Sequence, residues 1–119
     1  HKLVEAFQAT LSEAADADLL LHVIDASSPQ LAEQQLEVER VLREIGADDI
    51  PQILVYNKVD RLEPSARPRV PVDQLEVAPG VRFPRVFVSA VDGTGLDALR
   101  DTITAAVLAR QEQTSHVDA

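Results

Sequence analysis

The sequence predicts an α/β fold with three layers, in which helices flank a parallel sheet of three strands. Three short apolar runs suggest the strands, at 19–25, 52–56 and 85–88. The first run reads Leu19-Leu20-Leu21-His22-Val23-Ile24, which is too apolar for a strand with one wet face. Apolar strands that are joined by crossover segments favour a parallel sheet.

Helical periodicity precedes and follows the first strand. In residues 2–15 the apolar side chains recur at helical spacing and predict an amphipathic helix. After the strand, Ser27-Ser28-Pro29 is typical of a helix start, because proline suits the first turn. The apolar stripe of that second helix is Leu31, Val38, Val41, Leu42 and Ile45. Gly46 is the expected stop.

Prolines recur through residues 61–84 and would break any long helix there. We therefore expect an irregular crossover with at most one helical turn, near 72–76. We expect this crossover to be the most mobile segment. After the strand at 85–88, Thr94-Gly95-Leu96-Asp97 resembles a capping box. The last helix has a stripe of Leu96, Leu99, Ile103 and Val107. Residues 1–110 are predicted to form one domain, and 111–119 a disordered polar tail.

Composition narrows the classes of function. The net charge of −9 opposes direct nucleic-acid binding, and the lack of cysteine excludes disulfides and thiolate metal sites. No stretch approaches the roughly 20 apolar residues of a membrane span, and no signal-peptide pattern is present. These features are compatible with a cytoplasmic protein. Five arginines gather in the middle of the chain and indicate either a solvated loop or a local contact to RNA or a partner: Arg61, Arg67, Arg69, Arg82 and Arg85.

The most informative motif is Asn57-Lys58-Val59-Asp60, directly after the second strand. Polar turns at strand ends are where open α/β sheets place ligand contacts. The carboxylate of Asp60 can accept two parallel N–H bonds, which guanine offers on N1 and N2 and adenine does not. Lys58 can lay its methylene stem along the plane of the base. Asn57 carries a donor and an acceptor, so it can brace the turn.

A second motif, Ser89-Ala90, ends the third strand. In guanine-nucleotide-binding proteins, a strand that ends in Ser-Ala lies beside the Asn-Lys-x-Asp turn. Ser89 would hold the neighbouring loop, and the backbone N–H of Ala90 would meet the base oxygen. Asn-Lys-x-Asp alone should occur by chance in roughly one or two such chains per hundred. The two motifs together, in this order, favour a guanine site.

The parts that bind phosphate are missing from these 119 residues. No Gly-x-x-x-x-Gly-Lys-Ser/Thr loop occurs. Asp92-Gly93 lies after the strand that ends in Ser-Ala, so Asp92-Gly93-Thr94-Gly95 is not read as the Asp-x-x-Gly segment for Mg²⁺. Phosphoryl transfer depends on such parts, so we expect no useful GTP hydrolysis from this chain alone and assign no catalytic residue or metal ligand. His22 is predicted to be a core histidine bonded to a neighbour. Asp25 is predicted to organise the turn after its strand, with a direct ligand role as the less favoured reading.

The sequence resembles the second half of the GTP-binding domain of HflX-type GTPases. The opening His1-Lys2-Leu3-Val4-Glu5-Ala6-Phe7-Gln8-Ala9-Thr10-Leu11, the run Leu19–Ser27 and both base-recognition motifs carry the resemblance, which covers nearly all of residues 1–110. It implies a partial P-loop GTPase fold that lacks the phosphate-loop half. It also implies that GTP or GDP binds weakly or not at all to this piece, that Mg²⁺ belongs to the complete protein, and that the large ribosomal subunit is a partner.

Two other classes remain open. The chain could be a nucleotide-independent interaction or oligomerisation module. A receiver-type signalling domain would need an acidic pair at the end of the first strand, where only Asp25 stands. The resemblance also implies that the strand at 19–25 pairs with the absent phosphate-loop strand. A homodimer through that exposed edge is the resulting hypothesis.

Overall fold

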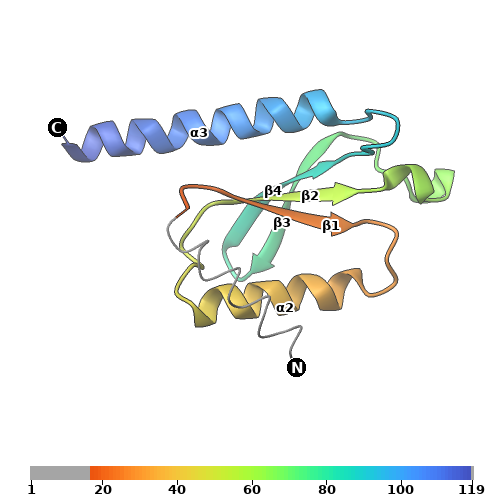
Figure 1. Ribbon diagram of the computed structural model, residues 1–119, viewed down its shortest axis with the longest axis horizontal. Coiled ribbons are helices and arrows are strands. Elements are labelled where there is room, and N and C mark those ends of the chain that lie inside the picture. Colours follow the sequence, from red (N-terminus) through yellow and green to blue (C-terminus); the bar gives the residue numbers. More distant parts are fainter. Residues whose placement is uncertain (1–16, 119) are drawn as a thin grey trace.

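Two helices enclose a β-sheet in a computed structural model that describes residues 17–118 (Figure 1). The predicted helix at 2–15 lies outside the described residues. In chain order the elements are β1 (Leu20–Asp25), α2 (Leu31–Glu44), β2 (Gln52–Asn57), β3 (Val72–Ala78), β4 (Val81–Phe87) and α3 (Leu96–Asp118), with short 3₁₀ turns at Val59–Arg61 and Pro64–Ala66. α2 lies on one face of the sheet and α3 on the other, so the chain has the predicted three layers (Figure 1).

The sheet has four strands in the order β1-β2-β4-β3. β2 pairs in parallel with both β1 and β4, whereas β3 and β4 are antiparallel. The prediction of an α/β fold with a parallel sheet therefore holds for three strands. The prediction that these three make up the whole sheet is wrong, because a fourth strand makes the sheet mixed.

The extra strand lies in the segment that was predicted to be an irregular crossover. Residues 72–78 and 81–87 form a hairpin whose turn contains Pro79 and Gly80, and Gly80 has a φ of +76°. β4 can contain Pro84, although proline has no N–H to donate to a neighbouring strand. The pairing of β4 with β2 begins only at the next residue, Arg85. The prolines do exclude an α-helix here, but a Pro-Gly pair is also a turn signal, and here it joins β3 to β4.

The core follows the alternation of side chains along the strands. On the α3 face, Ile53, Val55, Val86 and Val88 are buried, with Leu99 and Ile103 packed against them. On the α2 face, Ile24, Leu54 and Tyr56 form one cluster, and Leu42, Ala47 and Ile50 form another. β2 lies between two parallel neighbours and is buried from Gln52 to Tyr56. It thus fixes the position of the turn that follows.

Both helix ends depend on local signals. α2 ends as predicted at Gly46, where the Gly46 N–H donates to the Arg43 carbonyl and the Ala47 N–H to the Leu42 carbonyl. This is a Schellman motif, and it needs the positive φ of Gly46. α3 has no Thr94 capping box. The turn before α3 instead uses Asp92, whose carboxylate accepts the Thr94 N–H at 2.9 Å.

The buried face of α3 is displaced from the predicted stripe. Ala98 and Ala106 pack on the sheet with Leu99 and Ile103, whereas Leu96 and Val107 are each about two-fifths exposed. α3 extends to Asp118, through residues for which the sequence suggested a disordered tail. None of the helices among the described residues is long and apolar enough to cross a membrane.

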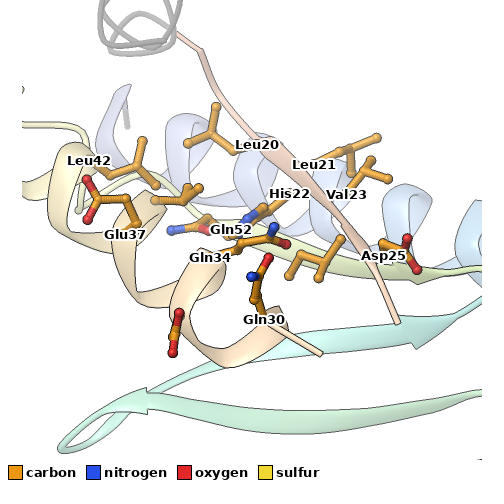
Figure 2. A pocket seen from close by; sticks show the side chains of 13 residues that line it. Leu20, Leu21, His22, Val23, Asp25, Gln30, Gln34, Glu37, Leu42 and Gln52 are labelled. Carbon is orange, nitrogen blue, oxygen red and sulfur yellow. The ribbon is translucent and has the colours of Figure 1, made fainter. Parts of the chain in front are cut away.

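β1 is less buried than its sequence suggests. Among the described strands it pairs only with β2, and α3 covers the centre of the sheet rather than this edge, so Leu21 and Val23 are 48% and 62% exposed. On the other face, a cavity of about 610 Å³ lies between β1 and α2, lined by Leu20, His22, Gln34, Leu42 and Gln52 among others (Figure 2). The expectation that both faces of this strand are buried is wrong for the described residues.

His22 lacks the hydrogen-bond partner that the sequence analysis expected. It is half-buried, and its Nδ1 is enclosed without a hydrogen-bond partner among the described residues. Burial lowers the pKa of His22 to about 4, because the charged imidazolium would lose its hydration. The prediction of a core histidine bonded to a neighbour is therefore wrong in its second part.

Candidate functional site

Two turns meet at the carboxyl ends of β2 and β4. We call residues 57–60 the β2 turn and residues 89–95 the β4 turn. Parallel pairing of the two strands places these turns side by side, and backbone bonds continue past the strand ends. The Val88 N–H donates to the Tyr56 carbonyl at 2.8 Å, and the Val59 N–H donates to the Val88 carbonyl at 3.2 Å. The two predicted recognition motifs therefore form one surface.

Asn57 joins the two turns. Its Oδ1 accepts the N–H of Lys58 at 2.8 Å and the N–H of Ala90 at 3.1 Å. The first bond helps to hold Lys58 at a φ of +68°, in the left-handed region that is costly for a residue with a Cβ atom. The second bond spans 33 residues of sequence. Asn57 thus braces the turn, in the manner that its mixed donor and acceptor chemistry suggested.

Asp60 and Ser89 make the second bridge. The Ser89 hydroxyl donates to Asp60 Oδ1 at 2.8 Å, and the Ser89 side chain is completely buried. The Ser89 backbone is fixed in turn, since its N–H donates to the Thr94 carbonyl and its carbonyl accepts the Gly93 N–H. Among the described residues, nothing donates to Asp60 Oδ2. One carboxylate oxygen is therefore anchored and the other is available to a ligand.

Lys58 points its ammonium away from its own turn, toward the end of β1. Its Nζ donates to Asp25 Oδ2 at 3.2 Å. Asp25 Oδ1 accepts the hydroxyl of Ser27 at 2.6 Å and the N–H of Ser27 at 2.9 Å. These bonds, led by that of the Ser27 hydroxyl, lower the pKa of Asp25 to about 2. Asp25 organises the turn after β1, as predicted, and it also has a contact to the β2 turn that sequence reasoning missed.

Ala90 is placed beside Asn57, but its N–H is already used. We expected this N–H to meet a base oxygen, and in the structure it donates to Asn57 Oδ1. An incoming carbonyl oxygen would have to share or replace that acceptor. A ligand carbonyl at this position would therefore compete with Asn57 for one donor, which the sequence could not indicate.

Gly95 is a further residue that sequence reasoning missed. Its φ is +76°, and a Cβ atom at this position would lie 2.0 Å from the carbonyl oxygen of Phe87. Because that oxygen belongs to the backbone of β4, no side chain could move aside to make room. The β4 turn can therefore pack against its own strand only with glycine here.

The arrangement offers groups for hydrogen-bond recognition. The β2 turn carries the carboxylate of Asp60 and the amide of Asn57, and the β4 turn braces both, which matches hydrogen-bond recognition of a flat polar ligand. Within residues 17–118, no group of three or more His, Asp or Glu side chains could hold a metal ion. The structure brings together all five predicted site residues, and their contact with a nucleotide stays a prediction.

Comparison with known proteins identifies the family. The chain is 43% identical over 103 residues to the GTPase HflX of Caldanaerobacter subterraneus, a match that covers 87% of this chain and 21% of the relative. It is 48% identical over 107 residues to the GTPase HflX of Gluconacetobacter diazotrophicus, covering 88% and 22%. It is 45% identical over 104 residues to the GTPase HflX of Escherichia coli, covering 87% and 23%. The chain belongs to the HflX family of GTPases.

The resemblance to HflX-type GTPases that the two motifs indicated is therefore confirmed. No protein-family model matches the sequence. The chain spans about a fifth of the length of these HflX relatives, so activities of a complete HflX protein are matters of proposal for this chain.

Proposed function

We propose that this chain is the guanine-recognition part of a GTP-binding, GTP-hydrolysing HflX-type protein. The observation that carries the proposal is the pair of bridges between the turns, from Asn57 to Ala90 and from Ser89 to Asp60. These bridges hold a carboxylate with one unused oxygen beside a backbone that is already braced. Such a preorganised site loses little freedom when a base binds.

In this proposal each residue of the two turns has a separate role. Asp60 accepts N1–H and N2–H of guanine, one at the unused Oδ2 and one at the second lone pair of Oδ1, which also accepts the Ser89 hydroxyl. This selects against adenine, because adenine lacks that pair of donors. Lys58 covers one face of the base with its methylene stem. Ala90 shares its N–H between Asn57 Oδ1 and the base oxygen, so that Asn57 and Ser89 still hold the two turns together.

Phosphate recognition and hydrolysis belong to the complete protein in this proposal. The phosphate loop and the Mg²⁺ segment are absent from these 119 residues, so base contacts alone must hold a nucleotide here. We expect a dissociation constant no better than about millimolar, which is roughly 4 kcal/mol of binding free energy. The complete protein would act in the cytoplasm, with Mg²⁺ and GTP, at the large ribosomal subunit.

A titration of residues 1–119 tests this function. Amide NMR spectra are recorded during addition of GMP, with AMP as the matched control at equal concentration and ionic strength. Saturable shifts at Lys58, Asp60 and Ala90 with GMP, and none with AMP, are expected. Equal shifts with both nucleotides, or shifts spread over the whole surface, would refute guanine recognition. Phosphate release with excess GTP and Mg²⁺ should stay at the rate of the buffer, and turnover would contradict the assignment of hydrolysis to the complete protein.

A second candidate function, an oligomerisation module, is favoured by the β1 edge. One side of β1 has no strand partner among the described elements, and the apolar side chains of Leu21 and Val23 are exposed beside it. Unpaired strand edges are templates for pairing with another chain, and a twofold dimer would let one edge serve both copies. Light scattering over a concentration series distinguishes the two functions, because the module would dimerise and would show no response to GMP.

A further inference from the structure

Asp25 stands at the junction between β1 and the β2 turn. The register of the parallel strands sets Asp25 opposite Asn57, and the N–H of Ala26 donates to the Asn57 carbonyl at 2.8 Å. The edge strand therefore ends directly beside the proposed base site. A side chain at this position can act on the turn without belonging to either recognition motif.

The carboxylate of Asp25 has a fixed orientation. Two donors of Ser27, its hydroxyl and its N–H, occupy Oδ1, so Oδ2 is left facing Lys58. The lowered pKa of Asp25 agrees with this geometry, since each of these donors stabilises the charged form. Lys58 thus meets a negative charge that is already in place, rather than a mobile side chain.

Lys58 needs such a partner. A lysine stem has four rotatable methylene units, and an exposed ammonium without a partner would let the stem take many conformations. The contact to Asp25 anchors the far end of this stem at 3.2 Å, while Asn57 anchors the near end through the Lys58 N–H. Both ends of the stem are therefore held beside the turn.

We infer that Asp25 is a positioning residue for base binding, which holds the ammonium of Lys58 so that its stem covers one face of the base. The inference rests on the proposed function, because it assigns a role within the same site. Asp25 does not touch the ligand. Its contribution is to affinity for any planar purine that enters, whereas selectivity between bases remains with Asp60.

Asp25→Asn is the sharpest variant. The asparagine oxygen can still accept both donors of Ser27, and its amide replaces only the acceptor that faces Lys58. The matched control is Glu37→Gln, which removes one negative charge from another exposed ion pair, that of Glu37 with Arg40 on α2. Lys58→Met keeps an unbranched stem and removes the ammonium. The double variant of Asp25→Asn with Lys58→Met completes a thermodynamic cycle.

GMP and XMP titrations followed by amide NMR provide the measurement, and unfolding midpoints verify that each variant is folded. Asp25→Asn should weaken GMP binding about threefold to fivefold, as expected for a half-exposed ion pair, with an unchanged ratio of GMP to XMP affinity. Glu37→Gln should bind as the wild type does. In the Lys58→Met background, Asp25→Asn should have no further effect. An equal loss of GMP affinity in the wild type and in Lys58→Met would mean that Asp25 only supports its own turn. Unchanged GMP affinity in Asp25→Asn would show that Asp25 has no role in base binding.

Failure of this inference can be separated from failure of the proposed function. If the wild-type chain shows no selective GMP response, the guanine site itself is refuted, and the role of Asp25 with it. If the wild type binds GMP and Asp60→Asn abolishes the preference for GMP over XMP, the site stands. An Asp25→Asn variant with wild-type affinity then overturns the positioning role alone.

Discussion

Replacing Asn57 with alanine tests the brace between the two turns. The change removes one acceptor, Oδ1, and with it the bonds from the N–H groups of Lys58 and Ala90 at 2.8 and 3.1 Å. A typical intramolecular hydrogen bond contributes about 0.5–1.5 kcal/mol to stability. Both donors can be hydrated in the variant, because Lys58 is half-buried and Ala90 is exposed. We therefore expect the free energy of unfolding to fall by about 1–2 kcal/mol, which is the lower part of the range for two lost hydrogen bonds.

Urea unfolding and amide hydrogen exchange give the assay. Asn57→Asp is the matched control, since a carboxylate keeps an acceptor at the same place, and it should retain most of the stability. Exchange should accelerate at Lys58 and Ala90 in the alanine variant and not at Val88, whose N–H is bonded to the Tyr56 carbonyl. A loss below about 0.3 kcal/mol, well under the value of one hydrogen bond, would refute the reasoning. Equal destabilisation by the two variants would do the same.

Three further predictions concern the scaffold. Gly95→Ala should destabilise the chain by about 2–4 kcal/mol in urea unfolding, because its Cβ would meet the Phe87 carbonyl oxygen at a positive φ; a neutral effect would show that the β4 turn can move. The pKa of His22 is 6.5 in the unfolded chain and about 4 in the folded one, so the unfolded state binds the proton first as the pH is lowered. The free energy of unfolding should therefore drop on the order of 2 kcal/mol between pH 6.5 and pH 4. His22→Leu should remove that slope, and an unchanged slope would exclude His22 as its source. Val23→Lys on the exposed edge should abolish any concentration-dependent self-association in light scattering, and persistent dimers would place the interface elsewhere.

The juxtaposition of the two turns could be predicted because it follows from one topological rule. Carboxyl ends of parallel strands meet at one edge of a sheet, so Asn57 and Ser89 had to lie close together once β2 and β4 were recognised as parallel. The identity of each contact could not be predicted. The use of the Ala90 N–H by Asn57, and the reach of Lys58 to Asp25, depend on side-chain conformations that sequence spacing does not encode.

The hairpin and the edge strand were mispredicted for different physical reasons. Prolines were read as breakers of helices, which they are, but Pro79-Gly80 also turns the chain between β3 and β4. The apolar run of β1 was read as buried on both faces, whereas Leu21 and Val23 remain exposed at an edge. An apolar strand with one face that nothing covers within the described residues violates the usual agreement between pattern and burial. That disagreement supports the oligomerisation hypothesis.

The base preference of the Asp60→Asn variant tests the central claim most directly. Substitution exchanges one carboxylate acceptor for a donor amide, so the pair of acceptors that matches N1–H and N2–H of guanine is lost. Competitive titration of the wild type and the variant with GMP and XMP should show a preference for GMP in the wild type and for XMP in the variant, with both proteins equally folded. An unchanged preference for GMP in Asp60→Asn would contradict the account, because Asp60 could not then be the group that reads the base.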